Sequence, residues 1–283
     1  MVHDSYQVVI IGAGPAGVAC ARELSALEVD YVILDAAMGG HTNIDYGVGE
    51  SGQSSREWFK SVVDFPINLV RTNARYIQGF ANHWEVSTQD EWCCHCQYLV
   101  IATGTKARTG GFIESDNLLI GPFKPAYEYD YTGKHVAILG GGDNAFEYAS
   151  ITLSKGASSA SIFARGIRAR KDLRAAAMSA GASVHLVADF DVKDMGGYVD
   201  IRGNRYDTCL VMYGFERVIP DMPDGQCLSP SLETVLGNSK AMFVVGDVVL
   251  GSVQSLERAT NSGKEAGIAI TTLLKHGMEA ISQ

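Results

Sequence analysis

The sequence predicts an α/β fold in which two parallel sheets each carry a glycine-rich turn between a strand and a helix. Two observations support this prediction. An unbroken apolar run at residues 8–11 precedes the glycine-rich segment 12–17, and a second run at 135–139 precedes the segment 140–145. Apolar runs of this length are typical of strands buried on both faces of a parallel sheet. Two dinucleotide-binding folds in tandem, each with three layers, are therefore expected.

The composition agrees with a folded chain that has sizeable cores. Of the 283 residues, 46% are hydrophobic and 19% are charged, and the formal net charge is −9. At roughly 150 residues per domain, this length corresponds to about two domains. An acidic chain is a poor candidate for binding nucleic acid or anionic lipid, because both interactions depend on basic surface.

The sequence also argues against export and against a membrane span. No apolar run reaches the roughly 20 residues of a membrane-spanning helix. The seven residues before the first predicted strand leave no room for a signal peptide. We therefore expect a cytoplasmic protein with reduced cysteines and with no nucleic-acid or membrane partner.

The first glycine motif has the full context of a dinucleotide fingerprint. Gly12 permits a tight turn, Gly14 lets a pyrophosphate approach the backbone, and Gly17 lets the helix pack against the strand. The helix N-terminus offers free N–H groups and a partial positive charge to phosphate. A short strand at 31–34 ends at Asp35, whose carboxylate can accept hydrogen bonds from a ribose diol.

The second motif differs at the position of the acid. The strand at 159–163 is followed by Arg165, and Arg168, Arg170 and Lys171 come shortly afterwards. A basic residue at this position suits a 2′-phosphate better than a free 2′-hydroxyl, which favours NADP over NAD. The alternative is that these arginines only lie on a solvated loop.

Further motifs extend the pattern over nearly the whole chain. In order they occupy residues 12–17, 39–41, 101–104, 140–145, 245–247 and 257–263. In this order and spacing the chain resembles the flavoprotein reductases with two dinucleotide folds, and among them the thioredoxin reductase group. The resemblance implies that the first motif binds FAD, that the nicotinamide domain is inserted into the FAD domain, and that the protein is a homodimer.

The resemblance also implies domain bounds and site residues. Residues 1–113 and 237–283 would form the FAD domain, and residues 114–236 the nicotinamide domain. Asp247 would hydrogen-bond the ribityl chain, and the backbone N–H of Ala259 would face the flavin pyrimidine edge. The expected FAD-binding residues are Gly12, Gly14, Pro15, Ala16, Asp35, Gly40, His41, Ala102, Thr103, Gly104, Gly246, Asp247 and Ala259. The expected NADPH-binding residues are Gly140, Gly142, Asp143, Asn144, Ala145, Arg165 and Arg170.

The sequence departs from the thioredoxin reductase group at one decisive place. Members of that group carry a redox-active Cys-x-x-Cys just before the second glycine motif, whereas residues 123–127 here are Phe-Lys-Pro-Ala-Tyr. A dithiol is what passes electrons onward by thiol exchange, so that route is closed. Phe123, Tyr127 and Tyr129 are candidates for packing near the isoalloxazine, where the dithiol would have been.

The cysteines elsewhere in the chain do not replace that pair. Cys93 and Cys96 form a Cys-x-x-Cys beside the predicted strand 98–101, in a hairpin with residues 83–86, but residues three apart in a strand face opposite ways. We interpret them as ordinary thiols on a sheet, without metal. A redox pair and a metal site, since cysteine and histidine are zinc ligands, stay open as alternatives.

The sequence thus predicts an FAD-dependent oxidoreductase that takes electrons from NAD(P)H. The acceptor would need no protein dithiol, as with a ferredoxin or flavodoxin, a quinone, a small disulfide or O₂. One alternative is an FAD-binding sensor or pseudoenzyme without turnover. Another is a disulfide reductase fed by reduced ferredoxin, which would itself need a dithiol.

Overall fold

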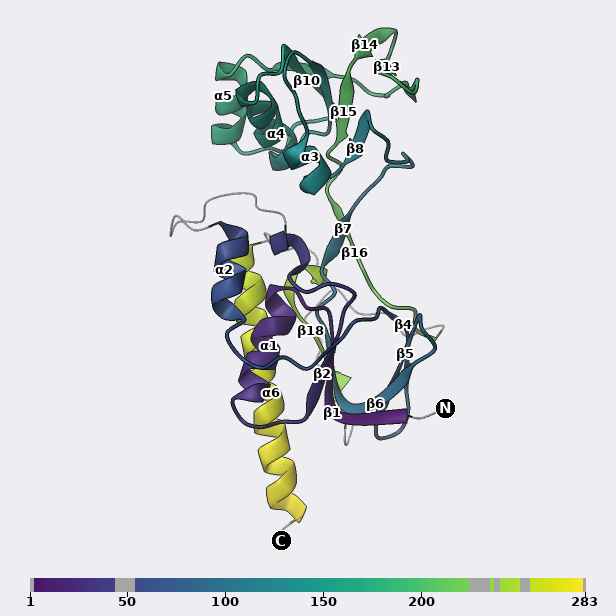
Figure 1. Ribbon diagram of the computed structural model, residues 1–283, viewed down its shortest axis with the longest axis vertical. Helices are drawn as coiled ribbons and strands as arrows, with labels where there is room; N and C mark the ends of the chain where they lie inside the picture. The colour runs from purple at the N-terminus through teal and green to yellow at the C-terminus, as the bar shows by residue number, and fades with distance from the viewer. Residues whose placement is uncertain (1–2, 44–53, 224–234, 237–239, 250–254, 282–283) are drawn as a thin grey trace. The chain divides into compact units, whose positions relative to one another are not determined.

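The computed structural model describes residues 3–43, 54–223, 235–236, 240–249 and 255–281. The chain divides into two compact units (Figure 1). The flanking unit comprises residues up to 105 and from 217 onward, and the inserted unit comprises residues 106–216. Two short strands, β7 (Thr105–Ala107) and β16 (Phe215–Arg217), pair where the chain passes between the units. These bounds describe compactness; the cofactor-binding domains with limits at 113/114 and 236/237 stay a prediction.

The flanking unit is built on an eight-stranded sheet. Its main path runs in the order β17-β18-β6-β1-β2-β3, and β5 joins β6 to β4. The bounds are β1 His3–Ile11, β2 Tyr31–Leu34, β3 Leu69–Val70, β4 Ala74–Gly79, β5 Trp84–Thr88, β6 Cys93–Ile101, β17 Val235–Leu236 and β18 Ala241–Val244. The pairs from β18 through β6, β1 and β2 to β3 are parallel, so their carboxyl ends lie at one edge.

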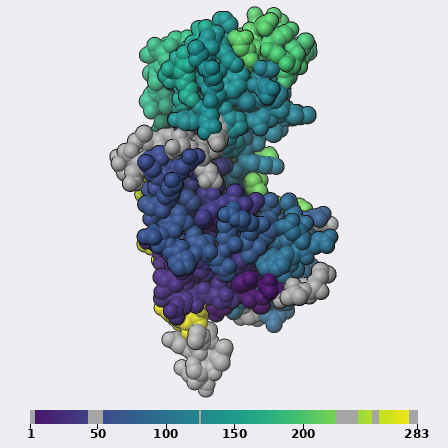
Figure 2. All heavy atoms as spheres, viewed as in Figure 1, coloured from purple at the N-terminus to yellow at the C-terminus, as the bar shows by residue number. Residues whose placement is uncertain are grey.

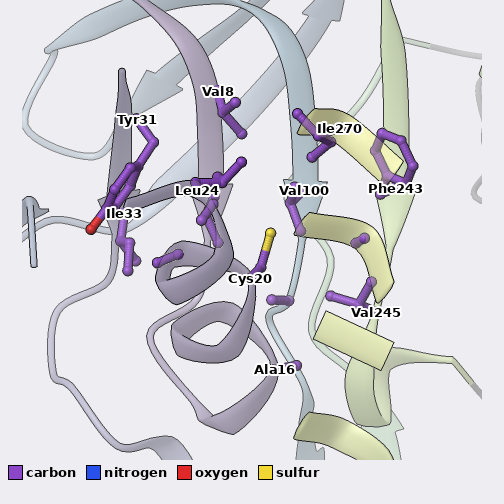
Figure 3. Close-up of a cluster of buried hydrophobic side chains, with 14 of the residues drawn as sticks. Val8, Ala16, Cys20, Leu24, Tyr31, Ile33, Val100, Phe243, Val245 and Ile270 are labelled. Carbon is purple, nitrogen blue, oxygen red and sulfur yellow. The ribbon is translucent and has the colours of Figure 1, made fainter. Parts of the chain in front are cut away.

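Helices cover one face of the parallel strands (Figure 1). On the other face, side chains of the β4–β5 hairpin, which belongs to the same sheet, pack against those strands. The helical elements are α1 Pro15–Ser25, η1 Gly40–Asn43, α2 Ser55–Val62, η2 Gly246–Val248 and α6 Leu256–Ile281. Figure 3 shows apolar side chains of the strands, such as Val8 and Phe243, meeting Leu24 of α1 and Ile270 of α6. On the opposite face, Ile77, Trp84 and Val86 are buried in a second cluster.

The close contact of α6 with α1 depends on glycine. A Cβ atom on Gly263 would lie 1.9 Å from the carbonyl oxygen of Ala16, and one on Gly267 would lie 2.7 Å from Cβ of Glu23. No side chain fits at either place without moving one helix away from the other. In the space-filling view, α6 shows mainly as a yellow area at the lower end of this unit, while purple and blue N-terminal residues form most of the unit's visible face (Figure 2).

The inserted unit repeats the architecture on a smaller scale. A five-stranded parallel sheet has the order β11-β10-β9-β15-β8, and a three-stranded antiparallel sheet has the order β12-β13-β14. Its elements are β8 Leu118–Ile120, α3 Lys124–Glu128, β9 His135–Leu139, α4 Asp143–Ser154, β10 Ser159–Ala164, α5 Lys171–Ser179, β11 Ser183–Leu186, β12 Val192–Asp194, β13 Val199–Ile201, β14 Asn204–Tyr206 and β15 Thr208–Val211.

The predicted α/β class with parallel sheets is confirmed. β2 and β9 have the bounds expected from the sequence, whereas β1 begins at His3, five residues before the apolar run. The added residues 3–6 pair with residues 93–96 of β6, so the partner strand extends β1 where its own sequence is polar. Within the described residues, no helix is both long enough and apolar enough to cross a membrane.

Candidate cofactor-binding sites

The turn between β1 and α1 forms an open cradle. Gly12 has a φ of +109°, and a Cβ there would lie 2.3 Å from the carbonyl oxygen of Ala102. At Gly17 a Cβ would lie 1.9 Å from the oxygen of Gly12. At Gly14, by contrast, a Cβ would meet no atom within 4 Å. Two glycines therefore bring backbone together, and the third leaves space in front of the helix.

The start of α1 is prepared for a negative charge. Gly14 is the N-cap with extended backbone, and Pro15 follows in the first turn. The first turn holds no acidic residue, and no side chain caps it among the described residues. The N–H groups of the first turn and the helix dipole therefore face the space at Gly14, and no acidic residue of that turn competes for them.

Asp35 directly follows β2 and lies beside this cradle. Its carboxylate accepts hydrogen bonds from the backbone N–H of Ala13 at 2.6 Å and of Ala37 at 3.0 Å. These bonds fix the carboxylate at the carboxyl edge of the sheet. A pocket of about 400 Å³ opens there, lined by Gly12, Asp35 and Thr103 among others.

The same pocket contains residues that the sequence analysis did not single out. Asn73, Arg75 and Gln89 line it together with residues 218–221. They come from the β4 region, the turn after β5 and the chain returning from the inserted unit. No local motif marks them, because only the folded sheet brings these segments to Asp35.

Gly40 and His41 lie on η1, against the cradle. The N–H of Gly39 donates to the oxygen of Ala13 at 2.9 Å, and a Cβ on Gly40 would lie 3.3 Å from Cα of Gly14. Burial lowers the pKa of His41, so its imidazole is neutral at neutral pH. The turn thus forms a second wall of the cradle.

The segment 102–104 continues from the end of β6 to the same edge. The N–H of Ala102 donates to Ile11 at 2.8 Å, and the hydroxyl of Thr103 donates to the carbonyl of Val218. Gly104 has a φ of +65°, which favours glycine, and its carbonyl accepts from Val218 at 3.2 Å. The outgoing and returning chains are therefore tied together here.

The closing motifs meet the first cradle from the other side. Gly246 has a φ of +75°, and a Cβ there would lie 2.8 Å from Cβ of Ala16 and 4.0 Å from Cβ of Ala259. Its N–H donates to Oγ of Ser262 at 2.9 Å. Burial raises the pKa of the adjacent Asp247. The structure thus gathers all the predicted FAD-binding residues at one edge of the flanking unit.

The second motif repeats the geometry of the first. Gly140 has a φ of +144°, and a Cβ there would lie 2.3 Å from the carbonyl oxygen of Met212. A Cβ on Gly142, the N-cap of α4, would meet nothing within 4 Å. Asp143, Asn144 and Ala145 form the first turn that follows. The inserted unit therefore carries an open cradle of the same design.

The arginines after β10 fall into two kinds. Arg165 and Arg168 are exposed, and Arg168 is held near the motif by its N–H, which donates to Gly141 at 2.7 Å. Arg170 is engaged by carboxylates: Nε lies 3.6 Å from Oδ2 of Asp143, and a terminal nitrogen lies 3.5 Å from Oδ2 of Asp172. Part of the positive charge expected for a phosphate is thus balanced by the protein.

Phe123 and Tyr127 have partners within the inserted unit. The Phe123 ring lies 6.2 Å from that of Phe215 in an edge-on arrangement. Nζ of Lys155 lies 4.5 Å from the centroid of the Tyr127 ring and donates to the Tyr127 carbonyl. Their place beside an isoalloxazine stays a prediction.

The cysteines of the described segments are five buried free thiols: Cys20, Cys93, Cys94, Cys96 and Cys209. Burial raises the pKa of Cys20 and of Cys94 to about 12, and raises those of the other three. Thiolates, the reactive form, are therefore disfavoured. Cys227 lies outside the described residues.

The profile of the pyridine nucleotide-disulphide oxidoreductase family matches residues 6–193. This match spans both glycine cradles and more than half of the chain. The chain belongs to this family.

Two curated proteins are similar to this chain over part of their length. The chain is 26% identical over 154 residues to ferroptosis suppressor protein 1 from Xenopus tropicalis. The matched region covers 53% of this chain and 41% of that protein. It is 30% identical over 185 residues to the small chain of glutamate synthase [NADPH] from Azospirillum brasilense, and this match covers 58% of this chain and 36% of that protein. The matches thus span about two fifths of those proteins.

Solved structures of similar fold cover nearly the whole chain. Thioredoxin reductase from Lactococcus lactis has a TM-score of 0.79 at 18% identity, with 96% of this chain and 99% of that chain covered. Thioredoxin reductase from T. acidophilum gives 0.75 at 18%, covering 95% and 99%. Bacillithiol disulfide reductase from Staphylococcus aureus gives 0.68 at 17%, also covering 95% and 99%. At these identities the likeness shows the fold.

A flavin dinucleotide fits the residues of the flanking unit in this pyridine nucleotide-disulphide oxidoreductase. The open space at Gly14 lies at a helix N-terminus with no acidic first turn, and Asp35 stands at the adjoining pocket. These are the features that a pyrophosphate and a ribose require. The cradle at Gly142 has the same open space for a second dinucleotide, although Asp143 adds a negative charge beside it.

Proposed function

We propose that this chain is an FAD-dependent oxidoreductase that takes electrons from NAD(P)H, with NADPH as the favoured donor. The observation that carries the proposal is the repeated cradle. A Cβ atom on Gly12 or on Gly140 would lie 2.3 Å from the carbonyl oxygen of a neighbouring segment, so only glycine fits at either position. A Cβ atom on Gly14 or on Gly142 would meet no atom within 4 Å, so the space in front of each helix is open. Two independent units with the same phosphate-binding geometry support two dinucleotides.

The chain's own residues have distinct tasks in this proposal. The N–H groups at the start of α1 bind the FAD pyrophosphate, Asp35 accepts hydrogen bonds from its ribose, and Asp247 contacts the ribityl chain. The first turn of α6, which begins at Leu256, would stabilise negative charge at the pyrimidine edge through the helix dipole, while the N–H of Ala259 itself donates to the carbonyl of Ser255 at 3.0 Å. When bound, FAD supplies a two-electron carrier between a nicotinamide donor and an acceptor.

The donor is proposed from the basic segment after β10. Arg165 is exposed at the end of that strand, where an acid would favour NAD. A guanidinium there can hold a 2′-phosphate through charge-assisted hydrogen bonds. Arg170 contributes less in this proposal, because Asp143 and Asp172 already hold its guanidinium.

The acceptor is proposed to react without a protein dithiol. Residues 123–127 contain no cysteine, and the cysteines of the described segments are buried thiols with raised pKa values. A ferredoxin-fed disulfide reductase loses support for the same reason. Among acceptors that need no dithiol, a small disulfide is favoured, since bacillithiol disulfide reductases share this fold. We further propose that the active form is a cytoplasmic homodimer.

The test is anaerobic mixing of the flavin-loaded protein with NADPH or with NADH, with the visible flavin absorbance followed in time. We expect NADPH to bleach the flavin at least about tenfold faster than NADH does. The reason is that NADH has no 2′-phosphate and so lacks one charge-assisted hydrogen bond to Arg165. Bleached protein is then mixed with small disulfides, quinones, ferredoxin or O₂ to identify the acceptor. A flavin that neither donor reduces would refute the enzyme and favour an FAD-binding sensor. A preparation without flavin would refute both.

A further inference from the structure

The hairpin of β5 and β6 brings three metal-ligating side chains to one face. Figure 1 shows β5 beside β6. The two strands pair antiparallel, with Glu85 opposite His95 and Ser87 opposite Cys93. Because side chains alternate along a strand, Cys93 and His95 point to the same side as Glu85. Cys94 and Cys96 point to the other side, into the buried core. The two cysteines of the Cys-x-x-Cys are therefore on opposite faces, as the sequence predicts.

The ligand atoms on that face are close together. Nε2 of His95 lies 3.0 Å from Oε2 of Glu85, and these atoms and Sγ of Cys93 all lie within 4.8 Å of one another. Around a tetrahedral zinc ion with ordinary bond lengths, ligand atoms are roughly 3.3–3.8 Å apart. The His95–Glu85 pair is slightly closer than this spacing and would open by a few tenths of an ångström, whereas any longer distance to Sγ of Cys93 would shorten by at most about 1 Å.

The surroundings hold these side chains in place. The His83 ring lies 4.8 Å from the His95 ring, and Phe80 stacks on His83 at 4.8 Å with an interplanar angle of 7°. Cys93 is only 7% exposed, whereas the His95 and Glu85 side chains are 30% and 25% exposed. The cluster is thus partly desolvated and still reachable by an ion.

We propose that Glu85, Cys93 and His95 form a zinc site on the β5–β6 hairpin. A thiolate, an imidazole and a carboxylate are the ligand types that zinc takes, and the thiolate disfavours Mg²⁺ and Ca²⁺. Three protein ligands leave the fourth tetrahedral position to water. The site lies within the flanking unit, and the proposed flavin chemistry does not require it.

Binding involves proton exchange and no change of oxidation state. Burial, with a further contribution from Glu85, raises the pKa of Cys93, so the side chain is a thiol at neutral pH. Zn²⁺ would bind Sγ as the S–H bond breaks, and the proton would pass to solvent. The hydrogen bond between His95 and Glu85 would be exchanged for two bonds to the ion.

The test is isothermal titration of ZnCl₂ into the chelator-treated, full-length protein with its flavin bound. The chain offers two matched pairs: Cys93→Ser against Cys94→Ser, neighbours on opposite faces of β6, and Glu85→Gln against Glu91→Gln, an exposed carboxylate in the hairpin turn. We expect one zinc ion per chain in the wild type and in both controls. Cys93→Ser and Glu85→Gln should each weaken binding at least 10- to 100-fold, the range seen when groups supporting a metal site are removed.

Far-ultraviolet circular dichroism and flavin content establish that each variant is folded. Should either cysteine variant fail to fold, the two glutamate variants decide the question, because both substitutions lie outside the buried core. Zinc binding that is absent from the wild type, or equal in Glu85→Gln and wild type, would overturn the proposal. In that case His95 and Glu85 form only a cross-strand ion pair.

Discussion

Replacing Gly14 by alanine should weaken FAD binding while leaving the fold intact. The backbone at Gly14 has φ −78° and ψ −175°, which alanine adopts without strain. A methyl group there would meet no protein atom within 4 Å. The only thing that it would displace is a ligand in front of the α1 N-terminus, so this substitution separates cofactor binding from packing.

The expected magnitudes differ for stability and for binding. At an N-cap, alanine is worse than glycine by about 0.5–1 kcal/mol, and the lower entropy of the unfolded alanine chain returns about 0.4–1 kcal/mol. The melting temperature of the flavin-free protein should therefore change by less than about 2 °C. Losing one hydrogen bond to a charged phosphate removes about 1.5–3 kcal/mol, which is roughly a 10- to 150-fold weaker Kd for FAD.

The assay is fluorescence quenching of FAD on titration with flavin-free protein, alongside thermal unfolding followed by circular dichroism. Gly17→Ala is the contrasting variant, since its methyl group would lie 1.9 Å from the carbonyl oxygen of Gly12. It should lose about 1–3 kcal/mol of stability or fail to fold. An unchanged Kd in Gly14→Ala would refute the assignment of this cradle to a pyrophosphate.

Three further substitutions test other parts of the structure. Gly263→Ala should lower the stability by about 1–3 kcal/mol in thermal unfolding, because its methyl group would lie 1.9 Å from the oxygen of Ala16; unchanged stability would contradict the close packing of α6 on α1. Burial raises the pKa of Asp247, so the folded state holds a proton there more tightly than the unfolded state does. The resulting contribution to the free energy of unfolding is fully present below the ordinary carboxyl pKa and is lost as the pH rises through the raised pKa. The melting temperature of Asp247→Asn should therefore rise relative to that of the flavin-free wild type as the pH increases from about 4 to 7. A difference in melting temperature that does not change with pH would contradict the raised pKa of Asp247. Arg165→Ala should raise the KM for NADPH about tenfold or more and leave that for NADH nearly unchanged in steady-state assays, whereas equal effects on both would remove its proposed role at the 2′-phosphate.

The parts of the fold that the sequence predicted well are those set by local signals. The strands at 31–34 and 135–139 and the two glycine turns depend on short apolar runs and on backbone that only glycine can adopt. Such signals act within a few residues. They could therefore be recognised in the sequence before any tertiary contact was known.

Other features could not be recognised locally. β1 starts at His3 because its polar first residues pair with β6. Arg75 lines the Asp35 pocket because it lies on β4, whose pairing with β5 places it there. The interpretation of Cys93 also changed with the fold. The sequence alone left a metal site as one alternative for Cys93, whereas the antiparallel pairing sets Glu85 directly opposite His95.

The sequence by itself determined that the chain carries two glycine-rich turns, each between a strand and a helix, because single glycine residues mark a tight turn in the sequence. The tertiary structure alone decided which distant segments share a pocket or a sheet face with them. The reason is that strand pairing and helix packing join residues tens to hundreds of positions apart. Gly263 against Ala16 shows this most directly, since neither residue signals the other in the sequence and their contact leaves no room for a methyl group.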